Sequence, residues 1–452
     1  MRFGGNKTYI SMEFFKEFKR FPYFLQFLYE KITSSIAFIP LLMATGFFLF
    51  TGLMFYAESQ GLTPWMEERL PSVLFIKDWG VALSVLNVLV GALISLMVFS
   101  FSMVMVLLNN AASNFSPRIL PSLISNTFHQ IVLGTYLGTI TYCLLMIVNM
   151  TPNQDKIPLP GFSVFLGINF GVVCLFLFVF FINSISESVQ VEKILRSLYS
   201  STLDNMKNGV VSRLSDEEEP QDVKKWHPIA ADRSGYFQSV NLEKIGKIGA
   251  EENLKIKIVV SESKFILEGI PLFLCDKELE EEIQHKILEN FVLTISENVK
   301  DDHLIGFKQI TEIALKAMSP GINDPGTALS AINYLTILFM EKMKLPEAGA
   351  VVFKDDNDQK LPTNIWMEIV GFDELLFSIL APLRQYARHD LMVMMKMLEM
   401  LKFLHKKDYC TNKQREIIHR EIKVLVDDAE EYLTNSADYN RVLTFSESIM
   451  AG

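Results

Sequence analysis

Residues Ile36–Phe55 read IAFIPLLMATGFFLFTGLMF and contain no charged side chain. A helix of about 20 residues rises about 30 Å, which is enough to cross the hydrocarbon core of a bilayer. The run is longer than the apolar part of a cleaved signal peptide, and no small-residue cleavage site follows it. It therefore predicts a helix that spans a membrane and remains in the protein.

Three further runs of this kind follow in the first half of the chain, at Val81–Leu108, Ile131–Met150 and Phe162–Ile182. The longest of them, Val81–Leu108, would rise about 42 Å as a helix, so it must tilt or extend beyond the bilayer. The pattern predicts a transmembrane domain over residues 36–183, built from four spanning helices.

The charge of the chain is concentrated in its second half. Half of the 452 residues are hydrophobic and the formal net charge is −10, with most of the charged residues between 185 and 452. This distribution indicates a membrane part followed by a soluble part. The acidic balance argues against nucleic-acid binding, and the cysteines have no spacing typical of a disulfide framework or a zinc site.

The orientation in the membrane follows from the Lys and Arg residues that flank the first span. The loop after this span has only Arg69 and Lys77 among its acidic residues, whereas the segment before it is basic, with Arg2, Lys7, Lys16, Lys19, Arg20 and Lys31. We therefore expect the N-terminus on the inner side of the membrane. Because four spans return the chain to the same side, we also expect a cytoplasmic C-terminal domain.

The N-terminal segment, residues 1–35, mixes aromatic and basic residues at roughly helical spacing in MEFFKEFKRFPYFLQFLYEK. This composition suits an amphipathic helix that lies in the headgroup region of the bilayer. The alternative is an extension of the first span that packs on the soluble domain.

Small and polar residues recur along the second span on what a helix makes one face. They are Ser84, Asn87, Gly91, Ser95 and Ser102, at spacings of three, four, four and seven residues. Residues three and four apart are neighbours on a helix surface. Either this face packs closely against another helix, or it lines a water-filled path, and the sequence leaves both open.

The third and fourth spans each contain a GxxxG pattern, Gly134 with Gly138 and Gly167 with Gly171. Small residues at this spacing let transmembrane helices approach closely. We therefore assign these glycines to helix packing. The spans contain no Asp, Glu or Lys near the bilayer centre of the kind that a proton-coupled transporter would use.

The soluble half is predicted to have an α+β fold. Residues 184–224 read as a helical extension and an acidic linker, residues 225–290 as a small β unit with a following helix, and residues 291–452 as a mainly helical domain. A half-buried strand is indicated by LKIKIVV, which alternates apolar residues with Lys. Two further short strands are indicated by FILEGIPLFLC, which places two apolar runs around Gly269. Residues 349–370 read as a further hairpin.

One motif in the helical domain, SPGINDP at residues 319–325, separates two helix-like segments. Pro320 disfavours helical dihedrals at Ser319 and ends the first helix, while Gly321 can adopt positive φ and reverse the chain. Pro325 suits the first position of the next helix, which makes Asp324 its N-cap and places Thr327 within reach of the carboxylate. Ser319, Asn323 and Asp324 also gather side-chain oxygens, so the turn is either purely structural or also a binding or assembly site.

Three stretches of the chain together point to a known family. They are ITEIALKAMSPGINDPGTALSAINYL, RSGYFQSV at Arg233–Val240 and NFSPRILPSLISNTFHQIVLGTYLGT at Asn114–Thr139. Through them the chain resembles a bacterial family of predicted inner-membrane proteins known as domain of unknown function twenty-two fifty-four. The resemblance covers roughly residues 30–395 and implies a multi-pass protein of the bacterial inner membrane with a cytoplasmic domain and no assigned reaction.

We expect a homo-oligomeric channel for an ion or a small solute, with the second span beside the path and the cytoplasmic domain as its gate or vestibule. The alternative is a non-transporting scaffold or sensor whose cytoplasmic domain binds a partner or ligand. The chain has no Walker loop, GxGxxG, HExxH or GxSxG motif, so we expect no enzyme activity, cofactor or metal. The expected partners are the lipid bilayer and further copies of the chain.

Overall fold

The structure is a computed structural model that describes residues 37–71, 74–114, 127–150, 159–188, 190–209, 214–215, 220, 222–261, 264–294, 303–351 and 364–451. The chain divides into two compact units, one formed mainly by residues 1–189 and the other mainly by residues 190–452. We describe each unit by itself. The predicted N-terminal amphipathic helix lies outside the described residues, as does the connection between the strands of the predicted hairpin at 349–370.

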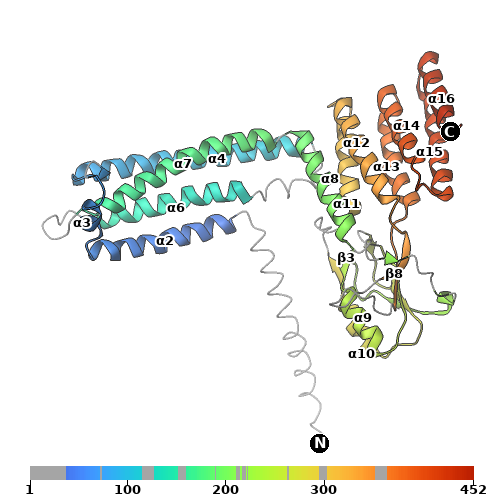
Figure 1. Ribbon diagram of the computed structural model, residues 1–452, viewed down its shortest axis with the longest axis horizontal. Coiled ribbons are helices and arrows are strands. Elements are labelled where there is room, and N and C mark those ends of the chain that lie inside the picture. Colours follow the sequence, from blue (N-terminus) through green and yellow to red (C-terminus); the bar gives the residue numbers. More distant parts are fainter. Residues whose placement is uncertain are drawn as a thin grey trace, which may run out of the picture. The chain divides into compact units, whose positions relative to one another are not determined.

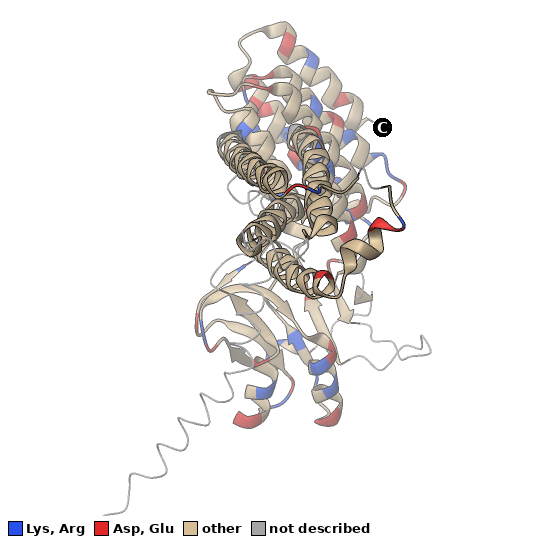
Figure 2. Ribbon diagram, turned by 90° about the vertical axis from the view of Figure 1, so that its left-hand side faces the viewer, with Lys and Arg blue, Asp and Glu red and all other residues tan. Residues whose placement is uncertain are grey.

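The first unit is a bundle of apolar helices (Figure 1). Its long helices are α2 (Phe38–Ser59), α4 (Trp79–Asn114), α6 (Thr127–Asn149) and α7 (Gly161–Ser188), and the short helix α3 (Leu62–Glu67) follows α2. Among the described residues, these four long helices are the ones long and apolar enough to cross a membrane, which confirms the predicted number of spans. They carry almost no charged residue along their length (Figure 2).

Helices α2 and α6 pack together through the glycines of the GxxxG pattern in α6. A Cβ atom at Gly134 would lie 3.1 Å from Pro40 Cα, and one at Gly138 would lie 2.7 Å from Phe47 Cγ. Both distances, one to backbone and one to a side-chain ring, are shorter than ordinary Cβ contacts, so the two helices approach as closely as they do because glycine is present.

Helix α7 packs against α4 through its own pair of glycines. Gly167 lies against Leu86, whose Cδ2 would be 3.3 Å from an added Cβ, and Gly171 lies directly against Leu89. Leu86 is fully buried in the apolar core of the unit, together with Tyr136, Tyr142, Cys143 and Phe181.

One end of the bundle is closed by a polar network around Glu58. The Glu58 carboxylate accepts hydrogen bonds from Thr63 Oγ1 at 2.7 Å, Ser163 N at 3.1 Å and Ser163 Oγ at 2.7 Å. Phe162 N donates to Thr63 Oγ1 at 3.0 Å, and Tyr142 OH donates to the Ser163 carbonyl at 2.8 Å. Because the carboxylate lies at the first turn of α7, it caps the free N–H groups and the helix dipole there.

The second unit contains two sheets. The six-stranded sheet has the order β1 (Leu214–Ser215), β8 (Ala348–Val351), β9 (Ile365–Glu368), β4 (Ile256–Ile258), β6 (Pro271–Cys275) and β2 (His227–Ala230). The three-stranded sheet has the order β5 (Phe265–Ile266), β3 (Gly235–Val240) and β7 (Phe291–Thr294). Helices α9 (Leu242–Glu251) and α10 (Glu281–Leu288) and the 3-10 helix η3 (Val223–Lys225) accompany them.

The two sheets share one apolar core, which includes Phe237, Phe273, Phe291, Ile256 and Ile365. Strand β4 pairs in parallel with β9, which lies more than a hundred residues later, and antiparallel with β6. The sheet therefore takes strands from outside residues 225–290, and the predicted β unit and helical domain share one compact unit.

Strand β4 differs from the predicted half-buried strand, because both of its faces are covered. Lys257, in the middle of β4, is only 8% exposed, and its ammonium donates to Glu368 Oε1 at 2.8 Å. An ion pair on the second face of the sheet thus replaces the expected contact with solvent.

The helical part consists of α8 (Val191–Asn208), which packs on α11 and α12, and of the helices that follow the sheets. These are α11 (His303–Ala317), α12 (Pro325–Lys342), α13 (Phe372–Ala387), α14 (Leu391–His405), α15 (Asn412–Tyr432) and α16 (Ser436–Met450). The fold class predicted from the sequence, four spanning helices followed by an α+β region with a helical C-terminal part, is confirmed.

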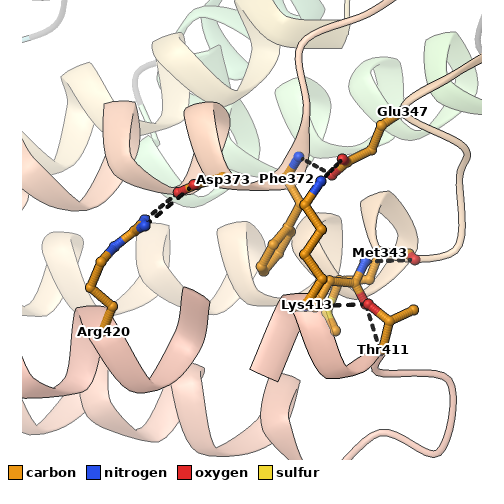
Figure 3. A network of polar contacts seen from close by, with 8 residues as sticks. Met343, Glu347, Phe372, Asp373, Thr411, Lys413 and Arg420 are labelled. Carbon is orange, nitrogen blue, oxygen red and sulfur yellow. Dashed lines mark hydrogen bonds and ion pairs between the residues drawn. The ribbon is translucent and has the colours of Figure 1, made fainter. Parts of the chain in front are cut away.

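A polar network fixes the start of α15 against α12 and α13 (Figure 3). Glu347 accepts from Phe372 N at 2.6 Å, at the start of α13, and from Lys413 Nζ at 3.1 Å. The buried amide of Gln414 donates to the Met343 carbonyl at 3.2 Å. Asp373, in the first turn of α13, forms a further ion pair with Arg420, about two turns after Lys413 in α15 (Figure 3).

Candidate functional site

The small and polar residues of α4 form a stripe on the surface of the first unit. Ser84, Asn87, Gly91, Ser95 and Ser102 are all exposed. At about 100° per residue, Ser84, Gly91, Ser95 and Ser102 fall within about 20° of one line along the helix, and Asn87 lies about 60° to one side. We call these five residues the polar face of α4.

The polar face lies on the opposite side of α4 from the residues that pack into the bundle. The buried residues of α4 include Ala82, Leu86, Leu93, Ser100 and Leu107. At about 100° per residue, these residues lie roughly 140–200° away from the polar face. The interpretation that this face packs against another helix therefore does not hold within the described chain.

The polar face is also not covered by other described elements. Ser95 Oγ donates to the Gly91 carbonyl at 3.0 Å and Ser102 Oγ donates to the Val98 carbonyl at 2.9 Å, which leaves the lone pairs of both hydroxyls available. A Cβ atom placed on Gly91 would meet no described atom within 4 Å. The face therefore offers hydroxyl and amide groups and an open strip of backbone to whatever adjoins it.

The SPGINDP turn joins α11 to α12 as a helix stop followed by a capped helix start. The Ser319 carbonyl accepts from Ile322 N and Asn323 N, each at 3.0 Å, and Ser319 Oγ donates to the Lys316 carbonyl at 2.6 Å. The bond from Ser319 Oγ satisfies the Lys316 carbonyl, one of the last carbonyls of α11. Asp324 N donates back to the Ala317 carbonyl at 2.8 Å, which closes the turn.

Asp324 is the N-cap of α12, and Pro325 occupies its first helical position. The carboxylate accepts from Thr327 N at 3.1 Å and from Thr327 Oγ1 at 2.6 Å. The hydrogen bonds from the Thr327 hydroxyl and then from its N–H lower the pKa of Asp324 below its ordinary value. The capped, ionised form also faces the positive end of the α12 dipole.

The chain reversal differs from the prediction at one residue. Asn323, rather than Gly321, has the positive φ, at 48°. Asn is among the few residues that adopt the left-handed region at modest cost. Pro320 and Gly321 form the exposed tip of the turn, and Asn323 and Asp324 are exposed as well.

Among the described residues, we found no arrangement of side chains typical of a catalytic or metal site. These residues include no group of three or more His, Cys, Asp and Glu side chains placed to hold a metal ion. The Glu58 network and a contact between His405 and His419 were not predicted, because each joins residues that no motif links in the sequence.

The fold and the four apolar helices define a multi-pass membrane protein. The family described as predicted membrane protein (DUF2254) matches residues 33–403, so the chain belongs to this family and the resemblance seen in the SPGINDP region is confirmed. Helices α15 and α16 follow the matched region.

Curated relatives come from mycobacteria. The chain is 22% identical over 389 residues to "Uncharacterized protein Mb1321c" of Mycobacterium bovis, a match that covers 80% of this chain and 71% of the relative. The identity and coverage are the same for "Uncharacterized protein Rv1290c" of Mycobacterium tuberculosis. No solved structure matches the chain.

Proposed function

We propose that the protein is a subunit of a homo-oligomeric channel in the bacterial inner membrane, in which the polar face of α4 borders the path of an ion or small solute. The observation that supports this function is the position of the polar face, exposed and opposite the buried side of α4.

Because lipid chains cannot form hydrogen bonds, this face is more stable in contact with water or with another protein surface than in contact with lipid. A hydroxyl or amide that faces lipid has no hydrogen-bonding solvent, and Asn87 makes no hydrogen bond to the described residues. The exposed side chains of α2 and α7 are apolar and suited to lipid, among them Leu41, Leu49, Leu53, Phe176 and Phe180. On α4 the exposed Val88 and Val98 flank the polar face, about 40° from its centre. Assembly around the polar faces of several copies would give these groups water and leave the apolar faces in lipid.

In this proposal the second unit is the cytoplasmic gate or vestibule. The basic residues before the first span favour a cytoplasmic N-terminus, and four spans would then return the second unit to the same side. The exposed SPGINDP turn is then a candidate contact between neighbouring cytoplasmic units, with Asn323 as the side chain that has no role in the turn's own hydrogen bonds.

Cysteine accessibility along α4 tests the proposal directly. All four native cysteines are buried, so the wild-type protein provides a low background for a charged, membrane-impermeant thiol reagent. Gly91→Cys, Ser95→Cys and Ser102→Cys sample the polar face. Ile94→Cys and Phe101→Cys are matched controls, because both residues are exposed on α4 but lie about 80–100° from the centre of that face.

We expect currents from the purified protein in planar bilayers, and block by the reagent in the three polar-face variants but not in the two controls. Ser95→Leu should reduce the current, whereas Ile94→Leu should leave it unchanged. Conductance no greater than that of empty liposomes would overturn the proposal, as would equal block of polar-face and control variants.

The exposed turn also supports a second candidate function, a scaffold that binds a protein partner through SPGINDP. Ile322 is 36% exposed at the tip of this turn, so its side chain would be available to a partner. Under this function Ile322→Asp would release a partner that co-purifies in fixed ratio with the wild-type chain, while the polar-face variants would retain it. If no protein co-purifies in fixed ratio, the scaffold function is excluded.

A further inference from the structure

We propose that the contact between His405 and His419 is a proton-sensitive latch that holds the C-terminal helical hairpin, α15 and α16, against α14. The inference concerns the second unit alone and does not depend on the channel proposal.

The two imidazoles meet across the α14–α15 interface. His405 is the last residue of α14 and is 7% exposed, and His419 is a half-buried residue in the middle of α15. Their Nε2 atoms lie 3.0 Å apart and their ring centroids 4.9 Å apart. At this distance one Nε2–H donates to the other Nε2, which must carry a lone pair.

The contact tolerates one added proton but not two. When one ring is protonated at both nitrogens, it still donates from Nε2 to its neutral neighbour. When both rings are protonated, both Nε2 atoms carry hydrogens, so the hydrogen bond is lost and two like charges face each other. The closed interface therefore binds at least one proton fewer than an open interface in which both histidines meet water.

The surroundings oppose protonation further. Burial lowers the pKa of His405, and His419, Arg415 and Lys406 lower it in the same direction. Arg415 and His419 come from α15 and Lys406 follows α14; among the described residues, α12, α13 and α16, which also pack against α14, add no charged group that acts on His405.

On α15 itself, His419 has charged neighbours at helical spacing. They are the cationic Arg415 and Lys423, four residues away on either side, and the exposed carboxylate of Glu416, three residues before. The cations outnumber the single carboxylate, and no carboxylate is hydrogen-bonded to either imidazole among the described contacts of the pair. A second proton on the pair is therefore not compensated locally.

The other contacts that hold α15 do not depend on two histidines. They include the Glu347–Lys413 and Arg420–Asp373 pairs (Figure 3) and the Arg384–Asp428 pair at 3.0 Å. His is the side chain whose ordinary pKa lies between pH 5 and 8. The three ion pairs contain no such side chain, whereas the latch contains two.

His389 provides an internal control at the far end of the same helix. Its Nδ1 lies 3.4 Å from the Tyr432 carbonyl at the end of α15. A protonated imidazole still donates to a carbonyl, so acid does not break this contact. Of these two histidine contacts of α15, acid is therefore expected to weaken only the one between His405 and His419.

The size of the pH effect follows from the difference in proton binding between the closed and open states of the hairpin. A histidine that stays neutral in the closed state and titrates near 6.5 in the open state lowers the ratio of closed to open hairpin about tenfold between pH 7.5 and 5.5. The direction is fixed, because a lowered native pKa stabilises the closed state at high pH and loses that stabilisation as pH falls below about 6.5.

Hydrogen exchange of the full-length protein in nanodiscs, with EDTA present, tests the latch. After correction for intrinsic exchange rates, amides in α15 of the wild type should lose about tenfold in protection between pH 7.5 and 5.5. For amides that exchange by local opening rather than by unfolding of the whole second unit, the loss should vanish in His405→Gln and in His419→Gln, and should persist in His389→Gln.

Each other outcome overturns the proposal. Wild-type protection of α15 that does not change with pH excludes a latch without reference to any variant. A loss of protection that persists in both His405→Gln and His419→Gln, or that disappears in His389→Gln, assigns the acid response to another group. A response that appears only when EDTA is replaced by Zn²⁺ assigns the pair to metal binding instead.

Discussion

Replacing Glu58 by alanine should open the end of the helical bundle where α2, α3 and α7 meet. The substitution removes the acceptor of three hydrogen bonds, one from Thr63 and two from Ser163. A buried hydrogen bond to a charged group contributes about 1.5–3 kcal/mol, and partial exposure reduces this to about 1 kcal/mol for each bond. We therefore expect Glu58→Ala to lower the free energy of unfolding by about 3 kcal/mol.

Glu58→Gln tests how much of this destabilisation comes from the loss of individual hydrogen bonds. The amide oxygen can still accept, but the NH₂ group that replaces the other oxygen faces donors, so about half of the stabilisation should be lost. The expected destabilisation is about 1.5 kcal/mol. Glu67→Gln is the matched control, because Glu67 is exposed in α3 a few residues later.

The measurement is thermal unfolding of the full-length protein in nanodiscs, followed by the fluorescence of the tryptophans near this end of the bundle, Trp65 and Trp79. At about 2–4 °C per kcal/mol, Glu58→Ala should lower the transition of the membrane unit by roughly 6–12 °C and Glu58→Gln by about half of that. If Glu58→Ala unfolds at the same temperature as Glu67→Gln, the carboxylate does not hold these helix ends and the energetic argument is refuted.

Three further predictions concern other elements. Asn323→Gly should leave the free energy of unfolding within about 0.5 kcal/mol of the wild type, whereas Asn323→Ala should lower it by about 1 kcal/mol, because glycine adopts the positive φ of the turn freely and alanine does not. Denaturant unfolding of the second unit measures both changes. Gly134→Ala should destabilise the bundle by about 1–3 kcal/mol through its contact with the backbone of α2, whereas Gly91→Ala, with open space around it, should not; equal unfolding temperatures would contradict this. Burial, followed by the nearby Lys342 charge, lowers the pKa of His303 to about 3, so the second unit should lose about 1.4 kcal/mol of stability between pH 7.5 and 5.5, and His303→Gln should flatten that pH dependence.

The parts of the fold that could be predicted are those set by local chemistry. Charge-free runs of sufficient length identify the four spans, because a helix that leaves water must satisfy its backbone internally. Asp324 could be assigned as an N-cap because Pro325 fixes where α12 begins. Helix α2 nevertheless continues to Ser59, past the predicted end at residue 55, because Glu58 finds its partners in α3 and α7.

The parts that could not be predicted depend on which surfaces meet. The spacing of Ser84, Gly91 and Ser95 defines a helix face, but only the position of α6 and α7 shows that this face is left uncovered. The choice of Asn323 rather than Gly321 for the positive φ depends on which carbonyls of α11 remain to be satisfied. In the same way, nothing near His405 in the sequence indicates that His419 would lie 3.0 Å from it.

The parallel pairing of β4 with β9 has a consequence for how the protein is made. Strand β4 ends at Ile258 and its partner begins at Ile365, and at about 5–20 residues per second a ribosome needs roughly 5–20 s to synthesise the intervening chain. Helix α8 likewise lacks its packing partners, α11 and α12, until they have been synthesised. The apolar spans are complete before this interval begins, so the nascent chain is anchored in the membrane while one side of β4 still lacks its neighbour. An unpaired strand edge is prone to aggregation, so the nascent second unit is vulnerable during this interval, until residue 368 has emerged.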